Sequence, residues 1–240
     1  FKKSPQNFRR LGYWAVKWLR SRKIESRIML VVLDDFIRDT LVQEFSDKLN
    51  ARNVLVIHHP VTTISSNTKS ESRSPSVCFI GYRTTFKGFD DFSRMALEYS
   101  SVSFLAIGEG KLENISNRTV EKLRDKNAFI EEISKCSLAM FPYTSGYRCS
   151  LSAAALDALS TGVYIVALDQ PFFRSLAEYF GPEIVTVYSS IGEFSFELDR
   201  KKLLLKQDDR VLRLDKISNS KYGLASVQRS FESLTSNPNS

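Results

Sequence analysis

The feature that most constrains the fold of this chain is a repeated alternation between short apolar runs and segments of helical spacing. Runs such as RIMLVVL, VCFIGY, SLAMFPY and VYIVAL recur between residues 27 and 188, and amphipathic or small-residue segments separate them. Apolar runs of this length predict strands that are buried on both faces, and their alternation with helices predicts a parallel sheet that is covered on both sides. We therefore expect an α/β fold with a doubly wound parallel sheet.

The region between the runs SVSFLAIGEG and SLAMFPY is less regular. Its spacing predicts a short helix over residues 119–125, a short strand NAFI at 127–130 and one helical turn, EEISKC. At the C-terminal end, a helix is expected from Lys216 onward, followed by a Ser/Asn-rich tail.

One polar segment organises the chain into parts. TTISSNTKSESRSPS has no periodicity and many serines, which is typical of a linker. The chain begins at Phe1 rather than at methionine, so we expect a fragment of a longer protein. We predict the last elements of an N-terminal domain in residues 1–62, a linker in 63–75, a sheet domain in 76–215, and a C-terminal helix and tail in 216–240.

The net charge of +7 indicates an anionic partner. Basic residues crowd positions 2–23 without any acidic residue, and Trp14 and Trp18 recur among them at helical spacing. A basic amphipathic helix with tryptophans is typical of an element on an anionic membrane surface, here residues 8–23, and packing against another part of the protein is the alternative. Nucleic acid is not favoured, because no aromatic stacking platform accompanies the charge. No apolar run approaches the roughly 20 residues that span a bilayer.

Ligands of such sheets bind outside the carboxyl ends of the strands, which selects the loops after Ile80, Ile107 and Phe141. The first loop, GYRTTFKGFDDF, places Arg83 and Lys87 four positions apart, so a guanidinium and an ammonium can clamp two phosphate oxygens. Solvated loop cations are the alternative. The second loop, AIGEGKLEN, permits a tight turn but lacks the third glycine of a dinucleotide fingerprint.

The third loop, PYTSGYRCS, precedes a helix of small residues. If this helix begins near Ser150, its free N–H groups and the partial positive charge of its first turn form an anion site. Arg148 would add a full charge beside that site, and Gly146 permits the turn. Asp157, two turns into the helix, can accept hydrogen bonds from sugar hydroxyls; a solvated helix acid is the alternative.

Other chemical motifs are few. The sequence contains no G-x-S-x-G, H-E-x-x-H or Walker A motif. His58 and His59 have no carboxylate or serine near them in the sequence, so we expect a structural role. Cys78, Cys136 and Cys149 form no C-x-x-C pair, which favours reduced thiols in a cytoplasmic protein over a metal site.

Four motifs follow one another in the order FIGYRTTFKG, AIGEG, NAFIEEISKCSLAMFPY and DALSTGVYIV. In this order and spacing they resemble the nucleotide-sugar-binding half of GT-B glycosyltransferases, in the family called glycosyltransferases group 1. The resemblance covers about residues 54–188. The chain departs from the family pattern at Tyr82, where an arginine is usual and Arg83 follows, and at Cys149, where the first of two glutamates is usual. The second glutamate corresponds to Asp157.

The resemblance implies a Rossmann-like sheet and a metal-independent, hexosyltransferase-like enzyme without a cofactor. It would move a sugar from a nucleotide-diphosphate sugar to a saccharide or lipid-linked acceptor in cell-surface polysaccharide synthesis. Its expected location is cytoplasmic, at the inner face of the plasma membrane. A sugar-nucleotide epimerase is disfavoured, because the C-terminal loops offer no histidine. A catalytically decayed nucleotide-sugar-binding or interaction module stays open as the alternative, which Tyr82 and Cys149 favour.

The resemblance also implies roles for individual residues. Arg83 and Lys87 would be catalytic, by neutralising the diphosphate as it leaves. Asp157 would hold the ribose, and the backbone near Phe129 and Ile130 would hold the base. The full set of expected substrate-binding residues is Gly81, Gly108, Glu109, Phe129, Ile130, Tyr143, Gly146, Arg148, Ser150, Leu151, Ser152 and Asp157.

Overall fold

The computed structural model of this chain describes residues 29–47, 49–64, 76–110, 119–120, 125–144, 151–199 and 209–235. The chain divides into two compact units, Phe1–His58 and His59–Ser240. The predicted basic helix at residues 8–23 and most of the predicted linker lie outside the described residues.

The first unit contains a small β–α–β arrangement. Strand β1 (Leu30–Val32) pairs in parallel with β2 (Val54–Val56), and helix α2 (Asp35–Glu44) and the 3-10 turn η1 (Ala51–Asn53) connect them. Asp34 caps α2, because its buried carboxylate accepts a hydrogen bond from the N–H of Phe36. The strand in RIMLVVL and its alternation with a helix, as expected for an α/β chain, are confirmed.

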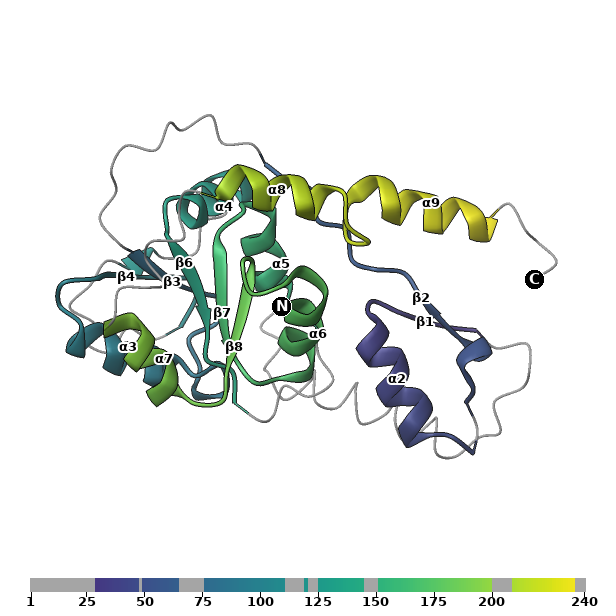
Figure 1. Ribbon diagram of the computed structural model, residues 1–240, viewed down its shortest axis with the longest axis horizontal. Coiled ribbons are helices and arrows are strands. Elements are labelled where there is room, and N and C mark those ends of the chain that lie inside the picture. Colours follow the sequence, from purple (N-terminus) through teal and green to yellow (C-terminus); the bar gives the residue numbers. More distant parts are fainter. Residues whose placement is uncertain are drawn as a thin grey trace. The chain divides into compact units, whose positions relative to one another are not determined.

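The second unit is built on a six-stranded parallel sheet with the order β5-β4-β3-β6-β7-β8 (Figure 1). Counted along the chain within this unit, the strands lie in the order third, second, first, fourth, fifth, sixth, which is the order of the Rossmann fold. The predicted doubly wound parallel sheet is therefore confirmed. The strands are β3 (Ser76–Ile80), β4 (Ser103–Ile107), β5 (Thr119–Val120), β6 (Leu138–Phe141), β7 (Tyr164–Leu168) and β8 (Val185–Tyr188).

Helices cover both faces of this sheet, as Figure 1 shows for α3 and α7 on one side and α5 on the other. Alternate strand residues such as Val77 and Phe79 pack with Phe92 of α3 and Phe194 of α7 in one buried cluster. The period of two along each strand directs the intervening residues, such as Cys78, to the opposite face. The helices are α3 (Phe89–Glu98), α4 (Lys126–Ser134), α5 (Ala153–Ser160), α6 (Pro171–Phe180), α7 (Ile191–Asp199), α8 (Arg210–Ser218) and α9 (Leu224–Thr235).

Two local predictions are wrong. Residues 127–130 form the first half of α4 rather than a strand, because Asp125 caps this helix by accepting from the N–H groups of Asn127 and Ala128 at 3.1 and 3.4 Å. Thr119 and Val120 form β5, which pairs with β4, rather than the start of a helix. A short apolar run without its tertiary neighbours does not separate helix from strand.

The C-terminal region is also more divided than expected. Lys216 lies inside α8, and a turn at residues 219–223 separates this helix from α9. Arg213 of α8 is buried and donates to the carbonyl of Gly162 at 2.9 Å, which holds the helix against the turn after α5. Among the described residues, no helix is both long enough and apolar enough to cross a membrane.

Candidate functional site

The candidate site lies at the carboxyl edge of the second unit's sheet, where strand order reverses between β3 and β6. Ligands of open parallel sheets bind at such a reversal, because the loops leave the two strands in opposite directions and leave a crevice between them. Three loops meet here: residues 81–88 after β3, residues 108–110 after β4, and residues 142–144 after β6.

Glycines let the first two loops approach each other. The N–H of Gly81 donates to the carbonyl of Ile107 at 2.8 Å. Gly108 has a φ of 138°, and a Cβ at this position would lie 2.1 Å from the carbonyl oxygen of Gly81. The predicted tight turn at Gly108 is therefore present, and only a glycine fits it.

Arg83 joins the first loop to the second. Its side chain is buried, and its guanidinium donates to the carbonyls of Gly110 and Ala106 at 3.2 and 3.5 Å. Its backbone N–H donates to the carbonyl of Glu109 at 2.8 Å. Arg83 thus carries its charge beneath the loops and holds their backbones together. Its predicted catalytic role stays a prediction.

Lys87 presents its ammonium at the centre of the site. It ends the 3-10 turn η2 (Thr85–Lys87), and its Nζ lies 2.9 Å from the point that a Cβ on Gly81 would occupy. The same Nζ lies 5.2 Å from the ring centroid of Tyr143. Burial lowers the pKa of Lys87 below its ordinary value, because a charged ammonium is less well hydrated there. An anion that replaced this lost hydration would bind favourably.

The loop after β6 supplies the other half of the site. A Cβ on Gly88, whose φ is 69°, would lie 1.8 Å from the carbonyl oxygen of Pro142. Thr144 donates to the carbonyl of Phe86 through both its N–H, at 3.3 Å, and its hydroxyl, at 3.1 Å. The backbones of the two loops are therefore in direct contact on either side of Lys87.

Helix α5 begins at Ala153, close to where the sequence predicts a helix start. Ser152 is its buried N-cap, and its hydroxyl accepts from the N–H of Ala155 at 3.3 Å. The hydroxyl of Tyr143 lies 3.0 Å from the same Ser152 oxygen. The cap links the end of β6 to the positively polarised end of the helix.

Asp157 lies on α5, half-buried, one turn beyond its first residues. Burial raises the pKa of this carboxyl, and the charges of Lys126 and His59 partly offset that effect. A half-buried carboxylate with cations near it can accept hydrogen bonds from hydroxyls. Its predicted contact with a ribose stays a prediction.

The structure brings seven predicted site residues into contact with one another: Gly81, Arg83, Lys87, Gly108, Glu109, Tyr143 and Ser152. Leu151 directly precedes the N-cap. Phe129 lies in α4, where its N–H donates to the carbonyl of Asp125 at 3.1 Å, and Ile130 is buried in the same helix, so their predicted contact with the base is untested. Gly146, Arg148 and Ser150 lie outside the described residues.

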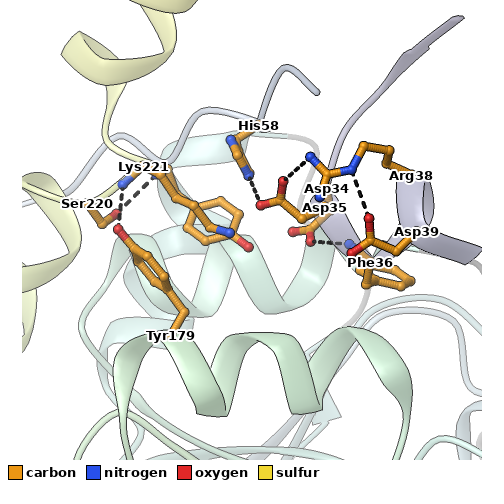
Figure 2. Close-up of polar contacts among 10 residues, drawn as sticks. Asp34, Asp35, Phe36, Arg38, Asp39, His58, Tyr179, Ser220 and Lys221 are labelled. Atoms are coloured by element: carbon orange, nitrogen blue, oxygen red, sulfur yellow. Dashed lines mark hydrogen bonds and ion pairs between the residues drawn. The ribbon is translucent and has the colours of Figure 1, made fainter. Parts of the chain in front are cut away.

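Sequence reasoning missed two groups of residues. Gly110 has a φ of 136°, and a Cβ there would lie 2.7 Å from the Cβ of Arg83. The second glycine of GEG is the sequence feature that could have indicated this close contact. In the first unit, His58 Nε2 lies 3.0 Å from Asp35 Oδ2, and Figure 2 shows this pair with Arg38 beside it. His58 follows β2 and therefore has a carboxylate partner 23 positions away, at the first residue of α2.

Comparisons with known proteins agree on the fold. No protein-family model and no curated protein sequence matches the chain. Among solved structures, a glycosyltransferase from Rickettsia africae has 10% identity and a TM-score of 0.68, over 100% of this chain and 69% of that one. HepE of Anabaena in complex with UDP has 14% identity and a TM-score of 0.66, over 87% and 64% of the two chains. TarM has 14% identity and a TM-score of 0.65, over 95% and 46%.

These matching structures are GT-B glycosyltransferases, and the chain therefore has the GT-B glycosyltransferase fold. The chain spans only part of the length of the structures it matches. For two further matches, it covers 44% of the matched chain in the GtfA/B complex and 62% of the lipopolysaccharide outer core galactosyltransferase WaaB.

The contact between Gly88 and Pro142 predicts that any side chain at position 88 destabilises the fold. Gly88→Ala combines a left-handed backbone with a clash against a carbonyl oxygen, so it should lower the free energy of unfolding by about 2 kcal/mol or more. Gly192→Ala is the matched control, because a Cβ there would meet only the Ser190 hydroxyl, at 3.8 Å. In helix α7 this control should be neutral or stabilising, by up to about 1 kcal/mol. Urea denaturation measures both, and equal effects would contradict the loop contact.

Proposed function

We propose that this chain is the donor-binding part of a glycosyltransferase. It would transfer a sugar from a nucleotide-diphosphate sugar to a saccharide or lipid-linked acceptor in cell-surface polysaccharide synthesis. The observation that carries the proposal is the position of the Lys87 ammonium beside the Gly81 turn, at the strand-order reversal of the sheet. The complexes of HepE with UDP and with UDP-glucose support it, since that protein has the same fold and binds this class of ligand.

The proposed chemistry depends on fixed positive charge. As the bond between the anomeric carbon and the diphosphate oxygen breaks, negative charge develops on that oxygen, and an acceptor hydroxyl forms the new bond and releases its proton. Lys87 and the first turn of α5 would stabilise the leaving diphosphate without a metal ion, because preorganised charges gain most where burial has already displaced water. Arg83 would add to the field and hold the loops that carry Lys87.

The N-terminal basic segment, residues 8–23, would hold the enzyme at an anionic membrane surface. These residues lie outside the described part of the chain, so the proposal rests on their sequence alone. Replacing both Trp14 and Trp18 by Ser should release the protein from vesicles that contain anionic lipid, as measured by sedimentation. Unchanged sedimentation would assign this segment to packing within the protein.

A thermal-shift titration tests the donor site directly. We expect saturable stabilisation by one nucleoside diphosphate among UDP, GDP and ADP, and weaker stabilisation by the matching monophosphate, because the second phosphate is the one that reaches Lys87. CMP covers the donors that carry a single phosphate. Stabilisation by none of these compounds, in a folded sample, would exclude the proposed donor site.

Lys87→Ala should weaken binding of that diphosphate by about 1.5–3 kcal/mol, the range for a hydrogen bond to a charged group. Lys135→Ala is a matched control, because Lys135 pairs with Glu131 and Glu132 at the far end of α4. Isothermal titration measures both affinities. Equal losses for the two variants would point to net charge rather than to a site at Lys87.

A further inference from the structure

Tyr143, in the loop after β6, contacts Lys87 of the loop after β3 in the candidate site. We propose that Tyr143 is a positioning residue, which holds the Lys87 ammonium where the diphosphate of the donor binds. This inference rests on the proposed function and assigns to Tyr143 a role other than direct contact with the substrate.

The ring of Tyr143 is fixed in place by the core. Its side chain has no exposed surface, and its ring centroid lies 5.7 Å from that of Phe141 and 5.5 Å from that of Phe173, with interplanar angles of 89° and 71°. Edge contacts of this kind favour one ring orientation. The hydroxyl adds a further restraint through Ser152, the N-cap of α5. Since the ring is fully buried, its effect on a ligand must pass through a neighbouring group.

That neighbouring group is the Lys87 ammonium. Its Nζ lies 5.2 Å from the ring centroid of Tyr143, within the distance at which the negative face of an aromatic ring attracts a cation. The attraction strengthens as water is removed, and burial already lowers the pKa of Lys87. The ring therefore favours the charged form of Lys87 at this position.

The contacts between the two loop backbones fix the Lys87 backbone but not the conformation of its side chain. Thr144 holds Phe86, the residue before Lys87, through two hydrogen bonds to one carbonyl. The lysine backbone is thereby fixed relative to the Tyr143 ring. A lysine stem of four carbons still has many rotamers, and the ring and the Gly81 turn select those that place Nζ between the ends of β3 and β6.

The alternative is that Tyr143 only fills the core, and a double-mutant cycle separates the two roles. Tyr143→Leu should weaken binding of the preferred diphosphate among UDP, GDP and ADP by roughly tenfold, the size of a desolvated cation–π contact. Tyr143→Phe keeps the ring and should restore affinity to within about twofold of the wild type. In the Lys87→Ala background, Tyr143→Leu should cause no further loss, because its effect passes through the missing ammonium.

The controls distinguish the possible failures. Phe104→Leu removes an aromatic ring of β4 that is as fully buried as that of Tyr143. It should lower the melting temperature without changing diphosphate affinity. An equal loss from Tyr143→Leu with and without Lys87, or no rescue by Tyr143→Phe, would overturn the inference while leaving the donor site intact. A wild-type protein that binds none of the three diphosphates would overturn the proposed function and the inference together.

A measurement on the wild-type side chains covers the case in which Tyr143→Leu does not fold. Reductive methylation with 13C-formaldehyde labels lysines and keeps their charge, and the signal lost in Lys87→Arg identifies Lys87. A lysine held over an aromatic ring has its methyl resonance shifted upfield by the ring current. We expect that shift for Lys87 without any ligand, and a resonance at the position of solvated lysines would overturn the inference.

Discussion

The close approach of two backbones at the strand-order reversal is the constraint on which the rest of the site depends. Parallel strands β3 and β6 are neighbours in the sheet, so the loops that leave them begin only one strand spacing apart. Gly88 lets the first loop rest on the carbonyl of Pro142, and Gly108 lets the loop after β4 rest on Gly81. With larger residues at these positions the loops would separate, and the Lys87 ammonium would lie in solvent instead of beside the Gly81 turn.

In this arrangement Arg83 and Lys87, four positions apart, have different roles. Arg83 points inward and donates to the carbonyls of Ala106 and Gly110, so it connects the loop after β3 to β4 and the loop that follows it. The Lys87 ammonium lies beside the Gly81 turn, where burial disfavours its charge and the Tyr143 ring favours it. A planar guanidinium suits two fixed carbonyls, and a flexible ammonium suits a ligand that arrives and leaves. The proposed leaving-group stabilisation follows from that second placement.

The sequence predicts the sheet and the loops well, because both depend on patterns that extend over many residues. The alternation of apolar runs and helical segments predicts the covered parallel sheet, and the end of each run predicts the loops of the site. The secondary structure of short segments is harder to predict. NAFI has too few residues to separate helix from strand, and it is helical because Asp125 caps the helix that contains it. The inward turn of Arg83 and the pairing of His58 with Asp35 depend on residues that are distant in sequence, so no local pattern reveals them.

The central claim is that a diphosphate binds between the loops after β3 and β6, in contact with Lys87. A crystal structure of the protein with the nucleoside diphosphate that stabilises it most would test this claim most directly. The account predicts an oxygen of the second phosphate within hydrogen-bonding distance of Lys87 Nζ, with the first phosphate toward the first turn of α5. A diphosphate bound elsewhere on the protein, with Lys87 still resting on Tyr143 and touching no ligand, would contradict it.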